Sequence, residues 1–159
     1  FNIKHKAIIT LIYSSGLRIS EVVNLKLSDI DSSRMRVFIR SGKGDKDRET
    51  ILSNECLSLL RDYYTAFKPK EYLFEGENGL YSTTSIRNVF NRAKDKARIN
   101  KGTVHSLRHS VATHLLNNGV SLRHVQLLLG HSSSKTTEIY TRLVDLNIKS
   151  PLDEAKRAS

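Results

Sequence analysis

The apolar residues of this chain recur at helical spacing along most of its length and change to a spacing of two in one short stretch. Ala7, Ile8, Leu11 and Ile12 form a stripe on one face of a helix, and similar stripes return in several later segments. Between residues 35 and 40, apolar side chains occupy every second position, which is typical of a strand. The sequence therefore predicts a mainly α domain with a small antiparallel β-sheet near the N-terminus, an α+β fold.

Glycines, a proline and capping residues mark the ends of the expected elements. Gly16, Gly119 and Gly130 each follow an apolar stripe, as C-capping residues do, and Pro69 ends a stripe that begins after Ser53. The apolar residues of that last stripe are Cys56, Leu57, Leu60, Tyr63, Tyr64 and Phe67. The expected helices are 4–14, 20–25 with Ser20 as N-cap, the segment from Ser53 to Pro69, 83–97, 105–118, 122–129, 134–140 and a fragment at 154–157; the expected strands are 35–40 and 49–52, joined by a turn at 41–47.

The charge of the chain indicates a polyanionic partner. Its 26 Lys and Arg residues exceed its 16 Asp and Glu residues by 10, and each phosphate that a basic side chain neutralises releases condensed counterions. A basic, solvated surface without a specific ligand would give the same balance. Charge alone therefore leaves nucleic acid and a merely basic surface both open.

The single cysteine and the lack of long apolar runs exclude several classes of protein. Cys56 alone excludes an intramolecular disulfide and a metal site built from clustered cysteines, and it is compatible with a reducing cytoplasm. No apolar run approaches the roughly 20 residues of a membrane span, so we expect no membrane association. The chain begins at Phe1 inside an expected helix, and we expect it to be a domain of a longer protein.

Polar residues stand beside the apolar patterns at four places. Arg18 lies in Gly-Leu-Arg-Ile-Ser-Glu at 16–21, and Lys43 lies between two glycines in the expected turn. His105 and Arg108 are three residues apart and share a helix face. The segment Leu-Leu-Gly-His ends at residue 131, and Tyr140 follows nine residues later. Each residue alone has an ordinary explanation as a surface or packing residue.

Together these side chains supply what phosphoryl transfer without a metal requires. Guanidinium forks bind non-bridging phosphate oxygens, a tyrosine hydroxyl can attack in line, and a lysine can protonate the departing oxygen. A tyrosine whose pKa is near its ordinary value of about 10 must lose its proton as it attacks, and nearby cations lower that cost. No carboxylate-rich metal site accompanies the set, so we expect neither a metal nor a cofactor.

The same residues resemble, in order, the motifs of the tyrosine recombinase (lambda-integrase-like) family. The motifs are Gly-Leu-Arg-Ile-Ser-Glu at 16–21, Gly-Lys-Gly at 42–44, His-Ser-Leu-Arg-His at 105–109, and Leu-Gly-His at 129–131 with Ile-Tyr-Thr at 139–141. The resemblance covers about residues 11–143 and is closest to Xer-type and bacterial mobile-element integrases. It implies the tyrosine recombinase catalytic-domain fold, and a site-specific recombinase that cleaves and rejoins double-stranded DNA through a 3′-phosphotyrosyl bond without metal or ATP.

The resemblance also implies a role for each motif residue that handles the phosphate. Arg18 and Arg108 would clamp the scissile phosphate, and His131 would hydrogen-bond it. Glu21 would support Arg18 rather than react.

Three further residues would carry the bond-making and proton-transfer steps that the resemblance implies. Tyr140 would be the nucleophile. Lys43 would be the general acid for the 5′-hydroxyl leaving group, and His105 would assist proton transfer at the tyrosine.

The resemblance divides the chain into a catalytic domain at 1–143 and a C-terminal tail at 144–159. The tail either packs on a neighbouring subunit or folds back on its own domain. We expect the family's N-terminal DNA-clamping domain to be absent from this chain. The full-length protein would form a homotetramer on DNA on the bacterial nucleoid, and this segment would be a monomer in isolation.

Three alternatives and one specificity hypothesis remain open. A type IB topoisomerase uses a similar residue set, a catalytically silent DNA-binding module would keep the fold, and a basic helical regulator would read the major groove. The motifs favour a recombinase. We expect integration or excision of an element rather than chromosome-dimer resolution, although the reversible chemistry serves both and the motifs do not distinguish them. Candidates to enter a DNA groove lie on one face of the expected helix 83–97: Arg87, Asn88, Asn91 and Arg92.

Overall fold

The computed structural model describes residues 2–40, 47–77, 79–130 and 151. The mainly helical α+β architecture expected from the sequence is confirmed. The helices are α1 (Ile3–Ser15), α2 (Ile19–Asn24), the 3-10 helix η1 (Leu27–Asp29), α3 (Asn54–Phe67), α4 (Thr83–Lys96), α5 (Val104–Asn117) and α6 (Leu122–Leu129). The strands are β1 (Ile30–Asp31), β2 (Arg36–Ile39), β3 (Arg48–Ile51), β4 (Glu75–Gly76) and β5 (Gly79–Leu80).

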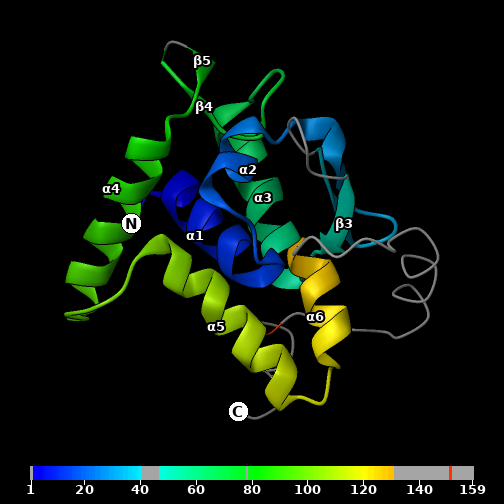
Figure 1. Ribbon diagram of the computed structural model, residues 1–159. Coiled ribbons are helices and arrows are strands. Elements are labelled where there is room, and N and C mark those ends of the chain that lie inside the picture. Colours follow the sequence, from blue (N-terminus) through cyan, green and yellow to red (C-terminus); the bar gives the residue numbers. More distant parts are fainter. Residues whose placement is uncertain (1, 41–46, 78, 131–150, 152–159) are drawn as a thin grey trace.

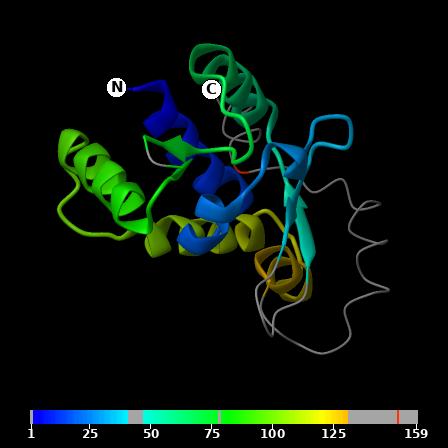
Figure 2. The ribbon, with the colours of Figure 1, turned by 90° about the horizontal axis from the view of Figure 1, so that it is seen from above.

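Helix α1 forms the centre of the domain. It packs against α3, α4 and α5, and Figure 1 shows it between α4 on one side and the sheet on the other. Seen from above in Figure 2, α5 crosses beneath α1. Because its neighbours surround it, α1 buries the apolar stripe predicted from the sequence: Ala7, Ile8, Leu11 and Ile12 are at most 1% exposed.

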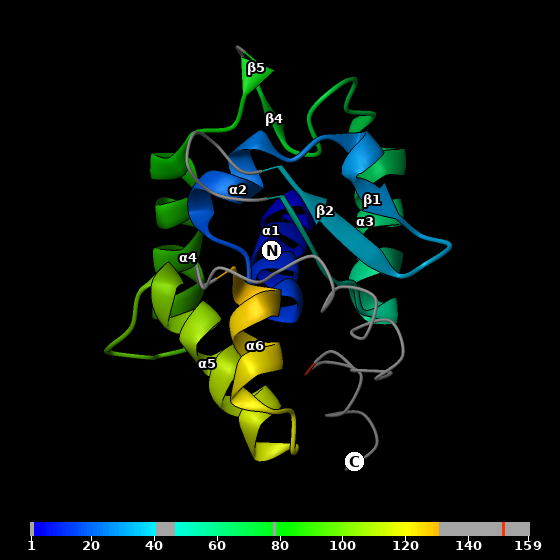
Figure 3. The ribbon, with the colours of Figure 1, turned by 45° about the vertical axis from the view of Figure 1, so that its right-hand side comes forward.

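The sheet is antiparallel in the order β1-β2-β3. Val37 pairs with Thr50 and Ile39 with Arg48, and the side chains of Val37 and Ile39 enter the core that α1, α2 and α3 share. Strand β3 also packs against α6, which lies below the sheet in Figure 3. The hairpin β2–β3 was predicted, whereas the two-residue strands β1, β4 and β5 were not, because two residues are too short to show alternation.

Several caps follow the prediction. Gly16 and Gly130 end α1 and α6 in the left-handed conformation, at φ 65° and 67°. Ser53 accepts a hydrogen bond from the backbone N–H of Cys56 at 3.0 Å and so begins α3.

Two details of the prediction are wrong. Ser20 was expected to cap the second helix, but α2 begins at Ile19 with Arg18 as N-cap, because the Glu21 carboxylate accepts the backbone N–H of Arg18 at 2.7 Å. Tyr64 and Phe67 were counted with the apolar stripe of α3, but they are 50% and 43% exposed. The stripe is therefore narrower than the sequence suggests, and its buried members are Cys56, Leu57, Leu60 and Tyr63.

Candidate functional site

The fold brings together Arg18 and Arg108, the two arginines predicted to bind phosphate. Arg18 stands at the N-cap of α2, and Arg108 lies in the second turn of α5. The guanidinium group of Arg108 reaches the C-terminal ends of α1 and α6, and that of Arg18 reaches the end of α6. Ninety residues of sequence separate the two arginines, so the pairing depends on the packing of α1 against α5 and of α5 against α6.

Arg108 is anchored by main-chain carbonyl oxygens. Its Nη1 donates to Gly16 O at 2.6 Å, its Nη2 donates to Leu129 O, and its side chain is 5% exposed. The last carbonyl groups of a helix have no intrahelical donor and carry the negative end of the helix dipole. The ends of α1 and α6 therefore supply acceptors that orient a buried cation.

Arg18 is anchored in the same way but lies nearer to solvent. Its Nη2 donates to Gly130 O at 2.9 Å and its Nη1 to Glu21 Oε1 at 2.9 Å. The side chain remains 35% exposed. A guanidinium carries five N–H donors, so it can keep such anchors and still donate to a phosphate.

A third arginine, Arg48, completes the cluster, and the sequence reasoning missed it. Arg48 begins β3, and its Nη1 and Nη2 donate to the two carboxylate oxygens of Glu21 at 2.7 and 2.9 Å. Its Nε donates to Leu128 O at 3.0 Å. An alternating strand does not reveal that one polar position faces inward toward a carboxylate 27 residues away, so no local signal pointed to it.

The cluster holds three guanidinium groups around one carboxylate, which leaves an excess of positive charge. Burial opposes ionisation of Glu21, but hydrogen bonds and charge from Arg48 and Arg18 outweigh it and lower the pKa of Glu21 below its ordinary value. Burial, reinforced by the charges of Arg18 and Arg48, lowers the pKa of Arg108 to about 10. An anion placed beside Arg18 and Arg108 would relieve this repulsion, so the arrangement is suited to bind a phosphate.

Of the other predicted catalytic residues, the structure describes His105 but not Lys43, His131 or Tyr140. His105 lies on α5 one turn before Arg108, as expected, and its side chain is exposed. Lys43, His131 and Tyr140 lie outside the described residues, as do positions 41–46 of the expected turn and the expected helices 134–140 and 154–157. The tail at 144–159 is described only at residue 151. The roles of Lys43, His131 and Tyr140 therefore stay predictions.

The candidate groove-reading residues share one exposed face of α4. Arg87, Asn88, Asn91 and Arg92 are all exposed, whereas Ile86 and Val89 on the opposite side are at most 3% exposed. Helix α4 also has Lys94 and Lys96 in its last turn. The helix thus presents a basic face to solvent, away from the core.

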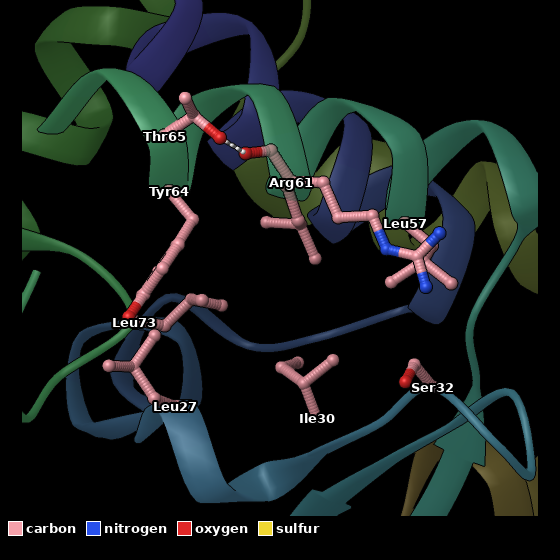
Figure 4. Close-up of a pocket in the computed structure, with 9 residues that line it drawn as sticks. Leu27, Ile30, Ser32, Leu57, Arg61, Tyr64, Thr65 and Leu73 are labelled. Atoms are coloured by element: carbon pink, nitrogen blue, oxygen red, sulfur yellow. Dashed lines mark hydrogen bonds between the residues drawn. The ribbon is translucent and has the colours of Figure 1, made fainter. Parts of the chain in front are cut away.

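A groove of about 540 Å³ lies between α3 and the η1–β1 segment. Figure 4 shows Leu57, Arg61 and Tyr64 on its α3 side and Leu27 and Ile30 on the other. Among the predicted site residues that the structure describes, none lines this groove. Within the described ranges, no group of three His, Cys, Asp or Glu residues could hold a metal, and no helix combines the length and apolar character needed to cross a bilayer.

Comparison with known proteins gives matches along nearly the whole chain. The sequence profile of the phage integrase family matches residues 1–146. The tyrosine recombinase XerA of Pyrococcus horikoshii is 37% identical over 160 residues, covering 98% of this chain and 56% of XerA. A crystal structure of XerA recombinase matches with a TM-score of 0.78 and 38% identity, over 88% of this chain and 52% of that one. The structure of the XerH site-specific recombinase bound to difH substrate, a pre-cleavage complex, matches with a TM-score of 0.73 and 30% identity. The match covers 90% of this chain and 44% of the XerH chain. The chain spans about half the length of the curated relatives it matches.

Proposed function

The chain belongs to the phage integrase family, and on that premise we propose that its protein cleaves and rejoins DNA strands at specific sites, with Tyr140 as nucleophile. One observation carries the proposal. Arg18 and Arg108, which are far apart in the sequence, meet beside Glu21 and Arg48 in a cluster with excess positive charge. Such a cluster fits the non-bridging oxygens of a single phosphodiester.

Each side chain has one task in the proposed reaction. Arg18 and Arg108 hold the non-bridging oxygens, and His131 donates a further hydrogen bond. The Tyr140 hydroxyl oxygen attacks phosphorus, a 3′-phosphotyrosyl bond forms, and the bond to the 5′-oxygen breaks. Lys43 gives a proton to that oxygen.

The second half of the reaction reverses the first on another strand. His105 assists the transfer of the tyrosine proton. A 5′-hydroxyl of a partner duplex then attacks the phosphotyrosine and releases Tyr140. The covalent link keeps the energy of the phosphodiester bond, so the cycle needs neither metal nor ATP.

We propose double-stranded DNA as the partner and a homotetramer as the assembly in which strands are exchanged, whereas this segment alone would be a monomer. The XerH complex with its difH substrate supports DNA as the partner. We further propose integration or excision of an element rather than dimer resolution, two outcomes that the same reversible chemistry serves. Such a substrate would place the protein on the bacterial nucleoid, in the cytoplasm.

A nicked suicide duplex tests the proposal. The full-length protein is incubated with nicked duplexes tiled from the DNA that flanks its gene, and the products are resolved on a denaturing gel. We expect a covalent protein–DNA adduct on one duplex, sensitive to protease and unaffected by EDTA. An adduct that requires a divalent ion would contradict the mechanism. Relaxation of supercoiled plasmid without synapsis would favour a type IB topoisomerase instead.

The exposed face of α4 gives a second prediction, on DNA binding. If Arg87 and Arg92 contact phosphates, Arg87→Ala and Arg92→Ala should each weaken binding and reduce the slope of log K against log salt by about 1. If they read bases, the preferred sequence should change instead. The measurement is fluorescence anisotropy over a salt series on two target duplexes. Arg61→Ala, which removes an equal charge from the distant α3 groove, is the control, and an identical loss in that variant would rule out a role specific to α4.

A further inference from the structure

Arg48 is buried at the centre of the arginine cluster, yet it belongs to none of the sequence motifs. We propose that Arg48 is a positioning residue for DNA cleavage: it fixes Glu21 and the end of α6, and thereby holds Arg18 and Arg108 in the geometry that binds the phosphate. The inference rests on the proposed function, because it assigns Arg48 a part in the same reaction.

The contacts of Arg48 tie three parts of the chain together. Its Nη1 and Nη2 donate to both oxygens of Glu21 at 2.7 and 2.9 Å, and its Nε donates to Leu128 O at 3.0 Å. The first pair fixes the carboxylate plane, since a bidentate pair restrains orientation as well as distance. The third bond fixes the last turn of α6. Arg48 therefore joins β3, α2 and α6 through one guanidinium.

Glu21 transmits this restraint to both candidate phosphate ligands. Its carboxylate accepts a hydrogen bond from the Nη1 of Arg18 at 2.9 Å and lies 3.9 Å from the Nη1 of Arg108. Without Arg48, the same carboxylate could turn to pair closely with Arg108 or to take up further donors of Arg18, and so draw those donors away from a phosphate. Arg48 thus occupies both oxygens of Glu21, so that Arg108 need not pair with it and Arg18 gives it only one guanidinium nitrogen.

Arg48 itself is not placed to touch DNA. All three of its guanidinium nitrogens donate to protein acceptors, and its side chain is 2% exposed, against 35% for Arg18. Because Arg48 is buried, we expect it to affect the reaction only through the residues that it contacts.

Gly130 shows how closely Arg48 is fitted to the end of α6. A Cβ added at Gly130 would lie 2.9 Å from the Cδ, Nε and Nη1 atoms of Arg48, and the backbone there has φ 67°. The space that glycine leaves is therefore filled by the Arg48 side chain.

The same sheet provides a matched control. Arg34 makes an equivalent fork with Glu49, with Nη1 and Nη2 donating at 2.8 and 3.0 Å, but its side chain is 52% exposed. Exposed pairs contribute about 0–1 kcal/mol at most, and this pair lies outside the cluster. Arg34→Met therefore removes a comparable ion pair without disturbing Glu21.

The test compares single-turnover cleavage with DNA affinity in the full-length protein, at a temperature well below each variant's unfolding midpoint. Arg48→Met should slow cleavage by about tenfold or more, a change of about 1.4 kcal/mol in the barrier, while the Kd for DNA changes far less. Arg48→Lys, which keeps the charge and loses the fork, should fall between wild type and Arg48→Met. Arg34→Met should cleave as wild type does.

A double-mutant cycle separates positioning from general stability. If Arg48 acts through Glu21, the variant Arg48→Met with Glu21→Gln should cleave about as slowly as the worse single variant, not as the product of the two effects predicts. Additive effects, or normal cleavage by the folded fraction of Arg48→Met, would overturn the proposal. If Arg48→Met does not fold, wild-type cleavage by Arg48→Lys would overturn it equally. A wild-type protein that forms no adduct would instead contradict the proposed function itself.

Discussion

Tyr140→Phe is expected to abolish the covalent protein–DNA adduct while DNA binding stays within about twofold of wild type. Phenylalanine keeps the ring and lacks the hydroxyl oxygen that forms the phosphotyrosyl bond. In a protease whose nucleophile has been removed, the rate falls by about 10⁶, so we expect no adduct at any practical time. The measurement is the nicked-duplex assay, with binding followed in parallel by anisotropy.

Two other tyrosines make this assignment specific. Tyr64, half exposed on α3, is the matched control, and Tyr64→Phe should form the adduct normally. Tyr63 is 1% exposed, and burial raises its pKa to about 12, which makes it a poor nucleophile near neutral pH. An adduct that persists in Tyr140→Phe would refute the assignment of Tyr140 as the nucleophile. Mass spectrometry of the DNA-linked peptide would then identify the residue that forms the bond.

Arg108→Ala is expected to lower the rate of cleavage by about 10² or more, with a much smaller loss of DNA affinity. Charge on the phosphate oxygens is stabilised most strongly in the transition state, and loss of one such donor costs about 3 kcal/mol. The variant also leaves Gly16 O and Leu129 O without the donor they have now. Each buried acceptor left without a partner costs about 1–3 kcal/mol of stability, so the unfolding midpoint should fall as well.

Two comparisons separate catalysis from folding in this experiment. Arg108→Lys keeps a positive charge but cannot reach both carbonyl oxygens with a planar fork, so it should recover little of the rate. Arg18→Ala removes a less buried cation and should slow cleavage with a smaller loss of stability. Equal losses of cleavage and binding in Arg108→Ala would show a phosphate anchor with no preference for the transition state.

The fold could be predicted well from the sequence because its helix ends are marked locally. Gly16, Ser53 and Gly130 act through the backbone of their own helices, so their signals lie within a few residues. The tyrosine recombinase catalytic-domain fold that the motifs implied is confirmed. The N-cap of α2 was missed because its hydrogen bond comes from Glu21, three residues into the helix, rather than from a serine before it.

The candidate site was predicted only where motifs mark it. Arg18 and Arg108 were assigned from the resemblance, and the structure places them together. Arg48 was missed because its partners, Glu21 and Leu128, lie 27 and 80 residues away and meet it only after β3 packs on α6. The burial of Tyr64 was wrongly predicted for a related reason. Helical spacing shows which face of a helix is apolar, but the neighbouring elements decide how many residues of that face they bury.

The arginines of the cluster are held largely by the main chain, and this limits how the protein can be altered. Gly16, Leu128, Leu129 and Gly130 each contribute a carbonyl oxygen, which no point mutation can remove. An inserted or deleted residue near either helix end would rotate these oxygens by about 100°. Insertions in the last turn of α1 or α6 should therefore be far less tolerated than substitutions there. For anyone engineering the protein, the lengths of these two helices are harder constraints than their sequences.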